Sequence, residues 1–159
     1  MQINDILLEK GSDVKTIDAD LNIHDAISVL TEHSIGALVV TGEAEAVVGI
    51  ITERDILRKC GECCNHGTEP SGSRGTVCAS SVRDAMTTDL IIGVPEDGPN
   101  YAMGIMTKNH IRHLPIMDNG NLVGLISIGD LVNMHLEEKI FKRRTLKDYL
   151  SRNSAPEDV

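Results

Sequence analysis

Aromatic side chains are almost absent from this sequence. Phe, Tyr and Trp together make up 2% of the residues, with no Trp and a single Phe. We therefore expect a core built from Ile, Leu, Val, Met and Ala. We do not expect single-stranded nucleic acid to bind by stacking, because that mode needs aromatic platforms.

Positive charge is also scarce. The chain has 15 Lys and Arg against 24 Asp and Glu, which gives a formal net charge of −9. Nucleic-acid binding depends on a basic surface, so the composition argues against a nucleic-acid partner. Any anionic ligand must instead be held by cations gathered locally.

Long apolar runs are missing as well. No stretch approaches the roughly 20 apolar residues that span a bilayer, and residues 1–5 lack the basic start of a secretory signal. We expect a cytoplasmic protein without membrane association. Its four cysteines should then be reduced thiols or metal ligands rather than disulfides.

Recognisable catalytic motifs are lacking too. The sequence contains no Gly-x-Gly-x-x-Gly loop, no P-loop, no His-Glu-x-x-His and no nucleophile with an evident base. We therefore expect that the protein is not an enzyme and carries no catalytic cofactor.

A ten-residue segment is present twice, shifted by 75 positions, as residues 47–56 and 122–131. Each copy reads as a buried strand that runs directly into a helix. A hydroxyl residue stands at each junction and an aspartate follows three positions later, as Thr52 with Asp55 and as Ser127 with Asp130. This is close to the capping-box pattern. A helix start also offers free N–H groups and partial positive charge to a phosphate, so capping and ligand binding are both open and are compatible.

Hydrophobic periodicity predicts the same order of elements in both halves. In the first half we expect a helix over 4–11, a strand over 14–17, a helix over 23–33, strands over 36–40 and 47–51, and a helix over 53–59. In the second half we expect a strand over 90–92, a helix over 101–106, strands over 111–116 and 122–126, a helix over 130–141 and a short helix over 146–150. The fold class is α/β, with two β-α-β-β-α repeats packed about a pseudo-twofold axis.

The chain divides into four segments on this basis. They are a first repeat with its N-terminal helix over 1–60, a Gly/Ser/Cys-rich loop over 61–81, a second repeat over 82–141, and a C-terminal helix and tail over 142–159. A half of about 60 residues buries little core by itself, so we expect the two repeats to pack on each other.

These residues resemble the cystathionine β-synthase (CBS) domain family, and the chain looks like a tandem CBS pair, or Bateman module. The marks are the two Gly-x-x-Thr/Ser-x-x-Asp segments, the His-Leu-Pro-Ile run at 113–116 and the Asp-Ala-Met-Thr run at 84–87. Thr-Glu-Arg-Asp in the first half combined with Ser-Ile-Gly-Asp in the second is typical of stand-alone bacterial pairs.

The resemblance implies that AMP, ADP, ATP, NAD(H) or S-adenosylmethionine binds in the cleft between the halves. It assigns the two aspartates to the ribose hydroxyls, and Thr52 and Ser127 to ribose or phosphate. An ionised carboxylate can indeed accept hydrogen bonds from two vicinal hydroxyls. Strand residues would form the adenine slot, and the position-matched candidates are Thr16, Ile17, Val39, Ile92, Gly93 and Pro115.

Basic residues near these segments are the candidates for holding phosphate. Arg112 and His113 adjoin a predicted cleft strand of the second half, which makes that half look better equipped, since the matching positions of the first half carry no charge. Arg54 stands at the helix start of the first half, where the second has Gly129, and arginine can grip phosphate with two hydrogen bonds. A single ligand with its phosphates between Arg54 and Arg112 fits this pattern. A surface or dimer ion pair for Arg54, and ordinary strand packing for His113, remain alternatives.

Cysteines gather where the first half ends. Cys60 and Cys63 have the spacing of metal ligands, but no second regular pair accompanies them. A metal site, a thiol redox sensor and an ordinary reduced loop are all open here. The candidate residues are Cys60, Cys63, Cys64, His66 and Cys78.

Together these features predict a homodimeric, disc-like CBS-pair module that senses energy or redox state by binding an adenine nucleotide. Because no catalytic domain accompanies the pair, we expect it to act on an unknown protein effector in trans. A metal- or thiol-dependent redox sensor that uses the cysteine loop is the first alternative. A dimerising scaffold with vestigial ligand sites is the second.

Overall fold

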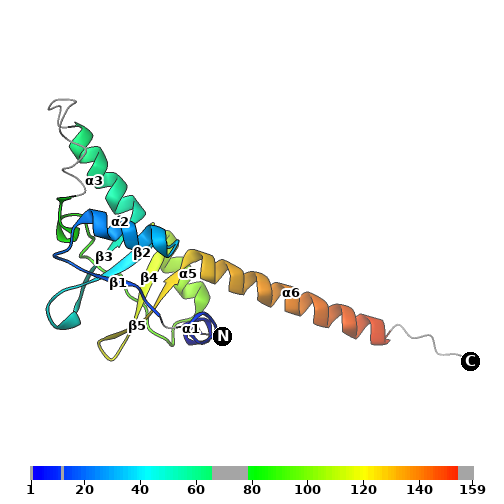
Figure 1. Ribbon diagram of the computed structural model, residues 1–159. Helices are drawn as coiled ribbons and strands as arrows, with labels where there is room; N and C mark the ends of the chain where they lie inside the picture. Colours follow the sequence, from blue (N-terminus) through cyan, green and yellow to red (C-terminus); the bar gives the residue numbers. More distant parts are fainter. Residues whose placement is uncertain (1, 12, 66–78, 154–159) are drawn as a thin grey trace, which may run out of the picture.

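The computed structural model describes residues 2–11, 13–65 and 79–153, and it contains two small α/β units and a long C-terminal helix (Figure 1). The first unit is a three-stranded sheet in the order β1-β2-β3, with β1 parallel and β3 antiparallel to β2. Its elements are α1 (Ile3–Lys10), β1 (Thr16–Asp18), α2 (Ile23–Glu32), β2 (Ala37–Thr41), η1 (Glu43–Glu45), β3 (Val47–Thr52) and α3 (Glu53–Asn65).

The second unit repeats this plan with one strand fewer. Its elements are η2 (Val82–Asp84), α5 (Pro99–Lys108), β4 (His113–Asp118), β5 (Asn121–Ser127) and α6 (Ile128–Asn153). The predicted strand over 90–92 is wrong, because only Gly93 forms a bridge, to Ile116 of β4. Pro115 of β4 has no N–H to donate to the chain before Gly93, where the matching Val39 donates to Lys15 O, and Pro95 has none to donate after Gly93, so the pairing extends in neither direction.

Two helices extend beyond their predicted ends. The predicted pair of helices over 130–141 and 146–150 is one helix, α6, because residues 130–153 contain neither Gly nor Pro and are rich in helix-forming Lys, Arg, Glu and Leu. Lys142 and Glu138 add an i,i+4 ion pair on its surface, at 2.6 Å. Helix α3 runs to Asn65 rather than stopping near Lys59. The predicted α/β class with two repeats is otherwise confirmed.

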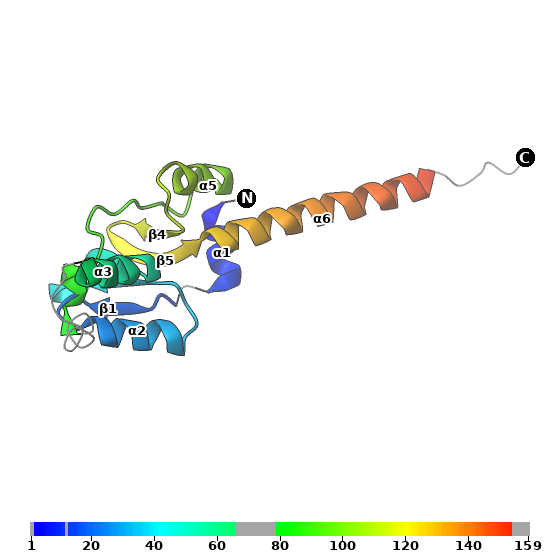
Figure 2. The same cartoon turned by 90° about the horizontal axis from the view of Figure 1, so that it is seen from above.

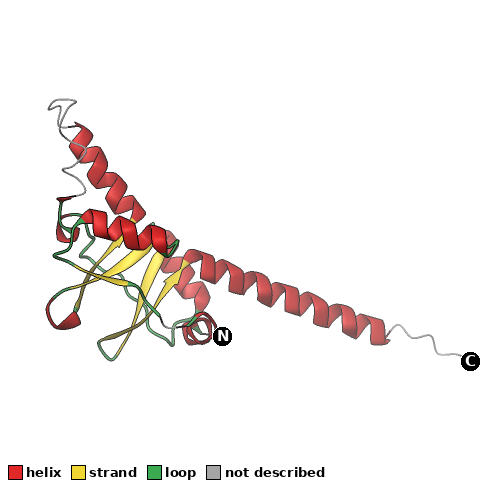
Figure 3. Ribbon diagram, viewed as in Figure 1, coloured by secondary structure: helices red, strands yellow, loops and turns green. Residues whose placement is uncertain are grey.

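The two sheets lie between α2 and α5, with the first repeat on one side and the second on the other (Figure 2). Figure 3 shows the strands gathered in the middle, with helices around them, while α6 projects far beyond the rest of the molecule. Among the described residues, none of the helices combines the length and apolar character that crossing a bilayer requires.

Each repeat has its own hydrophobic core, and each core is completed by the segment that begins the other repeat. The second core contains Ile3, Ile6 and Leu7 of α1 beside residues of α5, β4, β5 and α6. The first core contains Val82 and Ala85, from the start of the second repeat. Backbone hydrogen bonds follow the same exchange, since Ile3 N donates to Asp97 O and Val82 N donates to Leu21 O, at 2.9 and 2.8 Å.

The close contact of each strand with the first segment of the other repeat explains the glycines of the repeated segment, Gly49 and Gly124. A Cβ on Gly49 would lie 2.7 Å from Met86 Sδ and 2.9 Å from the Thr87 carbonyl oxygen. The matching Gly124 would meet the side chain of Leu7. A larger residue at either position would prevent β3 from lying this close to Met86 and Thr87, or β5 from lying this close to Leu7.

We expect Gly49→Ala to lower the free energy of unfolding by about 1–3 kcal/mol, the usual cost of overpacking. Gly124→Ala should cost less, because it meets the end of a side chain rather than backbone. Urea unfolding measures both. Gly104→Ala is the control: it lies within α5 with nothing inside 4 Å of the new Cβ, so it should gain about 0.5–1 kcal/mol. A loss at Gly49 no larger than at Gly104 would contradict the close approach.

Candidate functional site

A cavity of about 210 Å³ lies where the first repeat's strand-to-helix junction faces the second repeat. We call it the first cavity. From the first repeat it is lined by Gly36, Ile50, Thr52, Glu53, Arg54, Asp55 and Arg58; from the second it is lined by Thr87, His110, Ile111, Arg112 and His113.

Asp55 is the buried carboxylate of the first cavity, with 6% of its surface exposed. Its Oδ2 accepts hydrogen bonds from the N and Oγ1 of Thr52 at 2.9 and 2.6 Å, and Thr52 Oγ1 accepts from Asp55 N at 3.3 Å. The predicted reciprocal cap is therefore present. The other oxygen, Oδ1, accepts from Arg58 at 2.7 Å and from Thr87 Oγ1 at 3.2 Å. Thr87 comes from the second repeat, so the carboxylate also ties the two halves together.

Three arginines and two carboxylates line this cavity, which favours an anionic ligand. Arg54 reaches across the repeats and donates to the carbonyl oxygen of His110 at 3.2 Å. Arg112 is exposed and forms no salt bridge within the described residues. Arg54 and Arg112 thus share one cavity, as the sequence suggested. Arg112, however, lines the cavity of Asp55 rather than that of the aspartate in its own repeat, because the α5–β4 junction lies over the start of α3.

A second cavity, of about 290 Å³, is related to the first by the internal repeat. Thr87, His110, Ile50 and Thr52 of the first cavity correspond to Gly11, Ser34, Leu125 and Ser127 of the second. His110 and Ser34 both have positive φ, 55° and 53°, at matching helix ends. The full lining is Lys10, Gly11, Asp13, Val14, Lys15, Ser34, Ile35, Gly36, Ala37, His113, Leu125 and Ser127.

Asp130 is bonded like Asp55 but has a different cation. Its Oδ2 accepts from the N and Oγ of Ser127 at 2.7 and 2.8 Å, and from Lys10 Nζ at 2.6 Å. Burial raises the pKa of Asp130, but the bonds to Lys10 and Ser127 outweigh it and hold the pKa below its ordinary value. Lys10 also donates to Leu125 O at 3.1 Å. Asp130 is absent from the lining of the second cavity, whereas Lys10 is part of it.

His113 lies between the two cavities and lines both. Burial lowers its pKa, and the positive charges of Lys10 and Arg112 lower it further, while Glu53 and Asp130 partly oppose the shift. The imidazole is therefore neutral at pH 7. As a neutral group it can donate from one ring nitrogen and accept at the other.

The residues proposed for the adenine slot line neither cavity. Ile17 belongs to the first core. Gly93 has no room for a side chain against Ile116 and Leu114. Pro115 is buried within β4, and Thr16 and Ile92 are exposed elsewhere. The cavities are lined instead by the chain just before these positions, at Gly11, Asp13, Val14 and Lys15 and at Thr87. The offset of the internal repeat pairs Gly11 with Thr87 in the sequence. Neither residue lies in a segment with a hydrophobic period, so nothing in the sequence indicated that they line the cavities.

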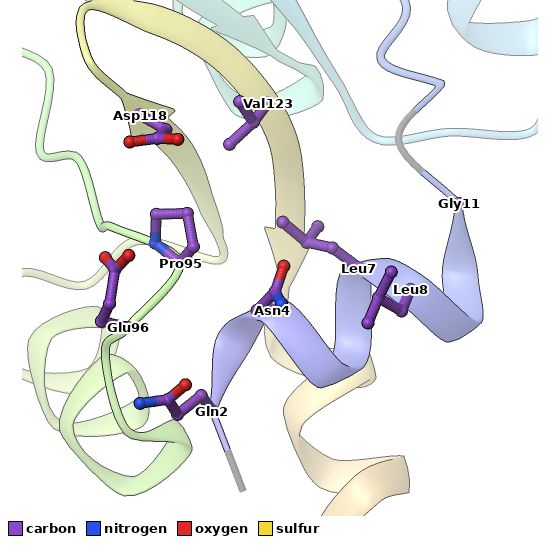
Figure 4. A pocket seen from close by; sticks show the side chains of 9 residues that line it. All are labelled: Gln2, Asn4, Leu7, Leu8, Gly11, Pro95, Glu96, Asp118 and Val123. Atoms are coloured by element: carbon purple, nitrogen blue, oxygen red, sulfur yellow. The ribbon is translucent and has the colours of Figure 1, made fainter.

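A further hollow of the described chain does not suit an anion. It has a volume of about 590 Å³ and lies between α1, the loop at Pro95 and Glu96, and the β4–β5 hairpin (Figure 4). The described residues that line it include the carboxylates Glu96 and Asp118 and no cation. We therefore do not place a nucleotide there.

The cysteine candidates are only partly described. Cys60 is a partly exposed free thiol on α3, and Cys63 and Cys64 follow in the same helix. His66 and Cys78 lie outside the described residues. Within the described part of the chain, no group of three His, Cys, Asp or Glu residues is placed to hold a metal. The metal and redox hypotheses stay predictions.

The lowered pKa of His113 predicts a pH-dependent stability. An unfolded histidine titrates near pH 6.5, so below about that pH the unfolded chain binds more protons than the folded one and the free energy of unfolding falls. Urea unfolding at several pH values measures this. His113→Gln should flatten the decline, whereas His24→Gln, at an exposed position of α2, should leave it unchanged. Equal slopes for both variants would contradict the assignment.

Comparison with known proteins identifies the family. The family model described as "CBS domain" matches residues 5–62 and 82–137. The mitochondrial CBS domain-containing protein CBSX3 of Arabidopsis thaliana is 36% identical over 159 residues, which cover 93% of this chain and 71% of that protein. A CBS-domain containing protein from Agrobacterium tumefaciens, ATU1752, has a crystal structure that is 36% identical, with a TM-score of 0.74, covering 83% of this chain and 91% of that one.

A more distant structure shares the fold alone. It is the CBS domain pair of protein MJ0100 in complex with methylthioadenosine and S-adenosylmethionine, 21% identical with a TM-score of 0.71, covering 87% of this chain and 98% of that one. The two matched segments coincide with the two structural units. This chain belongs to the CBS domain family and is a tandem CBS pair.

Proposed function

We propose that this protein is a regulatory module that binds adenine nucleotides, such as AMP, ADP, ATP or NAD(H), in the two cavities between its repeats. The observation that carries the proposal is the pair of equivalent cavities, each built at a helix start that holds a hydroxyl and an aspartate. The MJ0100 pair, which was solved with two adenosine-containing ligands, supports an adenosine class of ligand.

The chemistry of the first cavity fits each part of such a ligand. Asp55 is the acceptor for the ribose hydroxyls, because a carboxylate has about four lone-pair sites and charge-assisted hydrogen bonds are the stronger ones. Arg54 and Arg112 face the same space and meet the phosphates, with the N-terminus of α3 adding its partial positive charge. Three cations offset the two carboxylates there, so an anion enters a chain that is acidic overall.

Nucleotide binding would act on the contact between the repeats. Arg54 donates to His110 O, and Thr87 donates to Asp55, so both bonds cross from one repeat to the other at the cavity. A ligand that takes over Arg54 or Asp55 exchanges these contacts for its own and changes the packing of the halves. The change can be no larger than the difference in the ligand's affinity for the two arrangements. We propose that a protein effector reads this change in trans, in the cytoplasm.

We also propose that the protein works as a homodimer. An apolar groove of about 460 Å³ runs between α2 and α3, lined by Ile27, Leu30, Thr31, Ser34, Ile35, Glu53 and Ile56. Grooves of this kind on a helical face mark interaction sites. In a twofold dimer the α2–α3 groove of one copy packs against the same groove of the second copy.

Nucleotide affinity should depend on both aspartates. We expect Asp55→Ala and Asp130→Ala each to remove one binding event, or to weaken it at least tenfold (~1.4 kcal/mol), because the ribose loses a charged acceptor. Isothermal titration with AMP, ATP and NADH measures this, and Asp118→Ala at the acidic hollow is the control. Absence of binding below millimolar would reject nucleotide sensing, and wild-type behaviour of both variants would indicate a scaffold with vestigial sites.

The dimer should depend on the α2–α3 groove. Thr31 is exposed at this groove, so Thr31→Glu places a second carboxylate beside Glu53 without disturbing the core. We expect the variant to shift toward monomer in light scattering, while Leu8→Glu, at an exposed leucine on α1, stays dimeric. A Thr31→Glu protein with an unchanged mass would rule out this face.

A further inference from the structure

Lys10 ties the N-terminal helix to the aspartate of the second repeat. Its ammonium group lies 2.6 Å from Asp130 Oδ2 and 3.1 Å from Leu125 O. Lys10 is the last residue of α1, and the contact spans 120 positions of the sequence. Nothing in the repeated motif requires a lysine there.

The equivalent aspartate obtains its cation differently. Asp55 is paired with Arg58, one turn along its own helix, at 2.7 Å. The repeat places Asn133 at the position of Arg58, so the second helix start has no cation of its own. Lys10 supplies the missing charge from the other repeat.

This difference changes what a ligand meets in each cavity. Asp55 is part of the lining of the first cavity. In the second cavity Lys10, Leu125 and Ser127 are part of the lining, and Asp130, bonded to Lys10 and Ser127, is not. A ligand in this cavity therefore meets the ammonium group of Lys10, which is bonded to the carboxylate.

The ion pair between Lys10 and Asp130 is short, but a ligand can displace it. The side chain of Lys10 is 43% exposed and that of Asp130 22%, and partly exposed ion pairs of this kind contribute little net stability because water screens them. Lysine is a point charge on a flexible stem, so its ammonium can move while α1 stays in place. Ile3, Ile6 and Leu7 hold α1 in the second core independently of Lys10.

We propose that Lys10 is an exchangeable counter-ion that makes the second cavity selective for 5′-phosphorylated nucleosides; this inference rests on the nucleotide binding proposed above. The ribose hydroxyls replace the ammonium group at Asp130, and the freed ammonium pairs with the phosphate. An uncharged nucleoside displaces Lys10 without offering it a new partner. A cationic ligand such as a sulfonium places a second positive charge beside it.

Neighbouring charges do not substitute for Lys10. Lys15 lines the same cavity, but its partner is Asp13, at 2.7 Å, and not Asp130, so a ribose that binds Asp130 does not release Lys15. Arg112 lines only the first cavity. His113 lines both cavities but is neutral at pH 7, because burial lowers its pKa. Lys10 is thus the one cation of the described lining that a ligand's arrival releases.

The test compares AMP with adenosine in an Asp55→Asn background, which disables the first cavity. Isothermal titration should show AMP binding at least tenfold more tightly than adenosine. Lys10→Met should bring the two affinities together, with adenosine bound as well as before or better, and Lys10→Arg should restore the preference for AMP. A purely structural role for Lys10 would weaken both ligands equally.

Lys142→Met is the matched control, because Lys142 forms an ion pair of the same 2.6 Å length with Glu138, on α6 and away from both cavities. It should leave the ratio of affinities unchanged. In the ligand-free protein, NMR titration should show the pKa of Asp130 rising in Lys10→Met and staying constant in Lys142→Met.

Four results would overturn the inference. An AMP preference that survives in Lys10→Met, or an Asp130 pKa that does not respond to it, removes the role of Lys10 while nucleotide binding stands. Binding by the otherwise unchanged protein that vanishes in Asp55→Asn shows that the second cavity takes no ligand. If the unchanged protein binds neither AMP nor adenosine, the proposed function itself fails.

Discussion

The exchange of leading segments between the two repeats is the constraint on which the rest of this structure depends. Neither core is complete within its own repeat, and each is completed by the segment that begins the other repeat. Burial of these side chains provides the main driving force. The same exchange brings Thr87 to Asp55 and Lys10 to Asp130, so each carboxylate is contacted by the opposite half of the molecule.

The strand-to-helix junctions combine helix capping and the proposed ligand binding in the same residues. Asp55 and Asp130 satisfy the free N–H groups of Thr52 and Ser127 and so cap α3 and α6. Only one oxygen of each carboxylate is needed for this. The other oxygen of Asp55 is held by Arg58 and Thr87, groups that a ribose can replace without undoing the cap. Capping and the proposed binding are therefore compatible in one motif.

Most of the fold could be predicted from the sequence, because the spacing of the apolar residues indicates the helices and strands and the internal repeat indicates two similar units. The errors have local causes: Pro115 and Pro95 have no N–H to donate on either side of Gly93, and the absence of Gly and Pro lets α6 continue to Asn153. The candidate site was predicted in part. The repeated Thr/Ser and Asp and the pair Arg54 and Arg112 followed from the motif. The contacts that join the repeats did not, because Lys10 and Asp130 are far apart in sequence and only the packing of α1 brings them together.

The exchanged segments also couple the folding of the two halves. The first core needs Val82 and Ala85, so it cannot close when only the first 65 residues have left the ribosome. The second core needs α1, whose Ile3 bonds to Asp97, so the chain must keep its N-terminal helix available until the second repeat has emerged. Long-range contacts of this kind slow folding, since loop closure precedes any gain from packing. Both halves must therefore form together, and a tag or truncation at the N-terminus would be felt first in the second repeat.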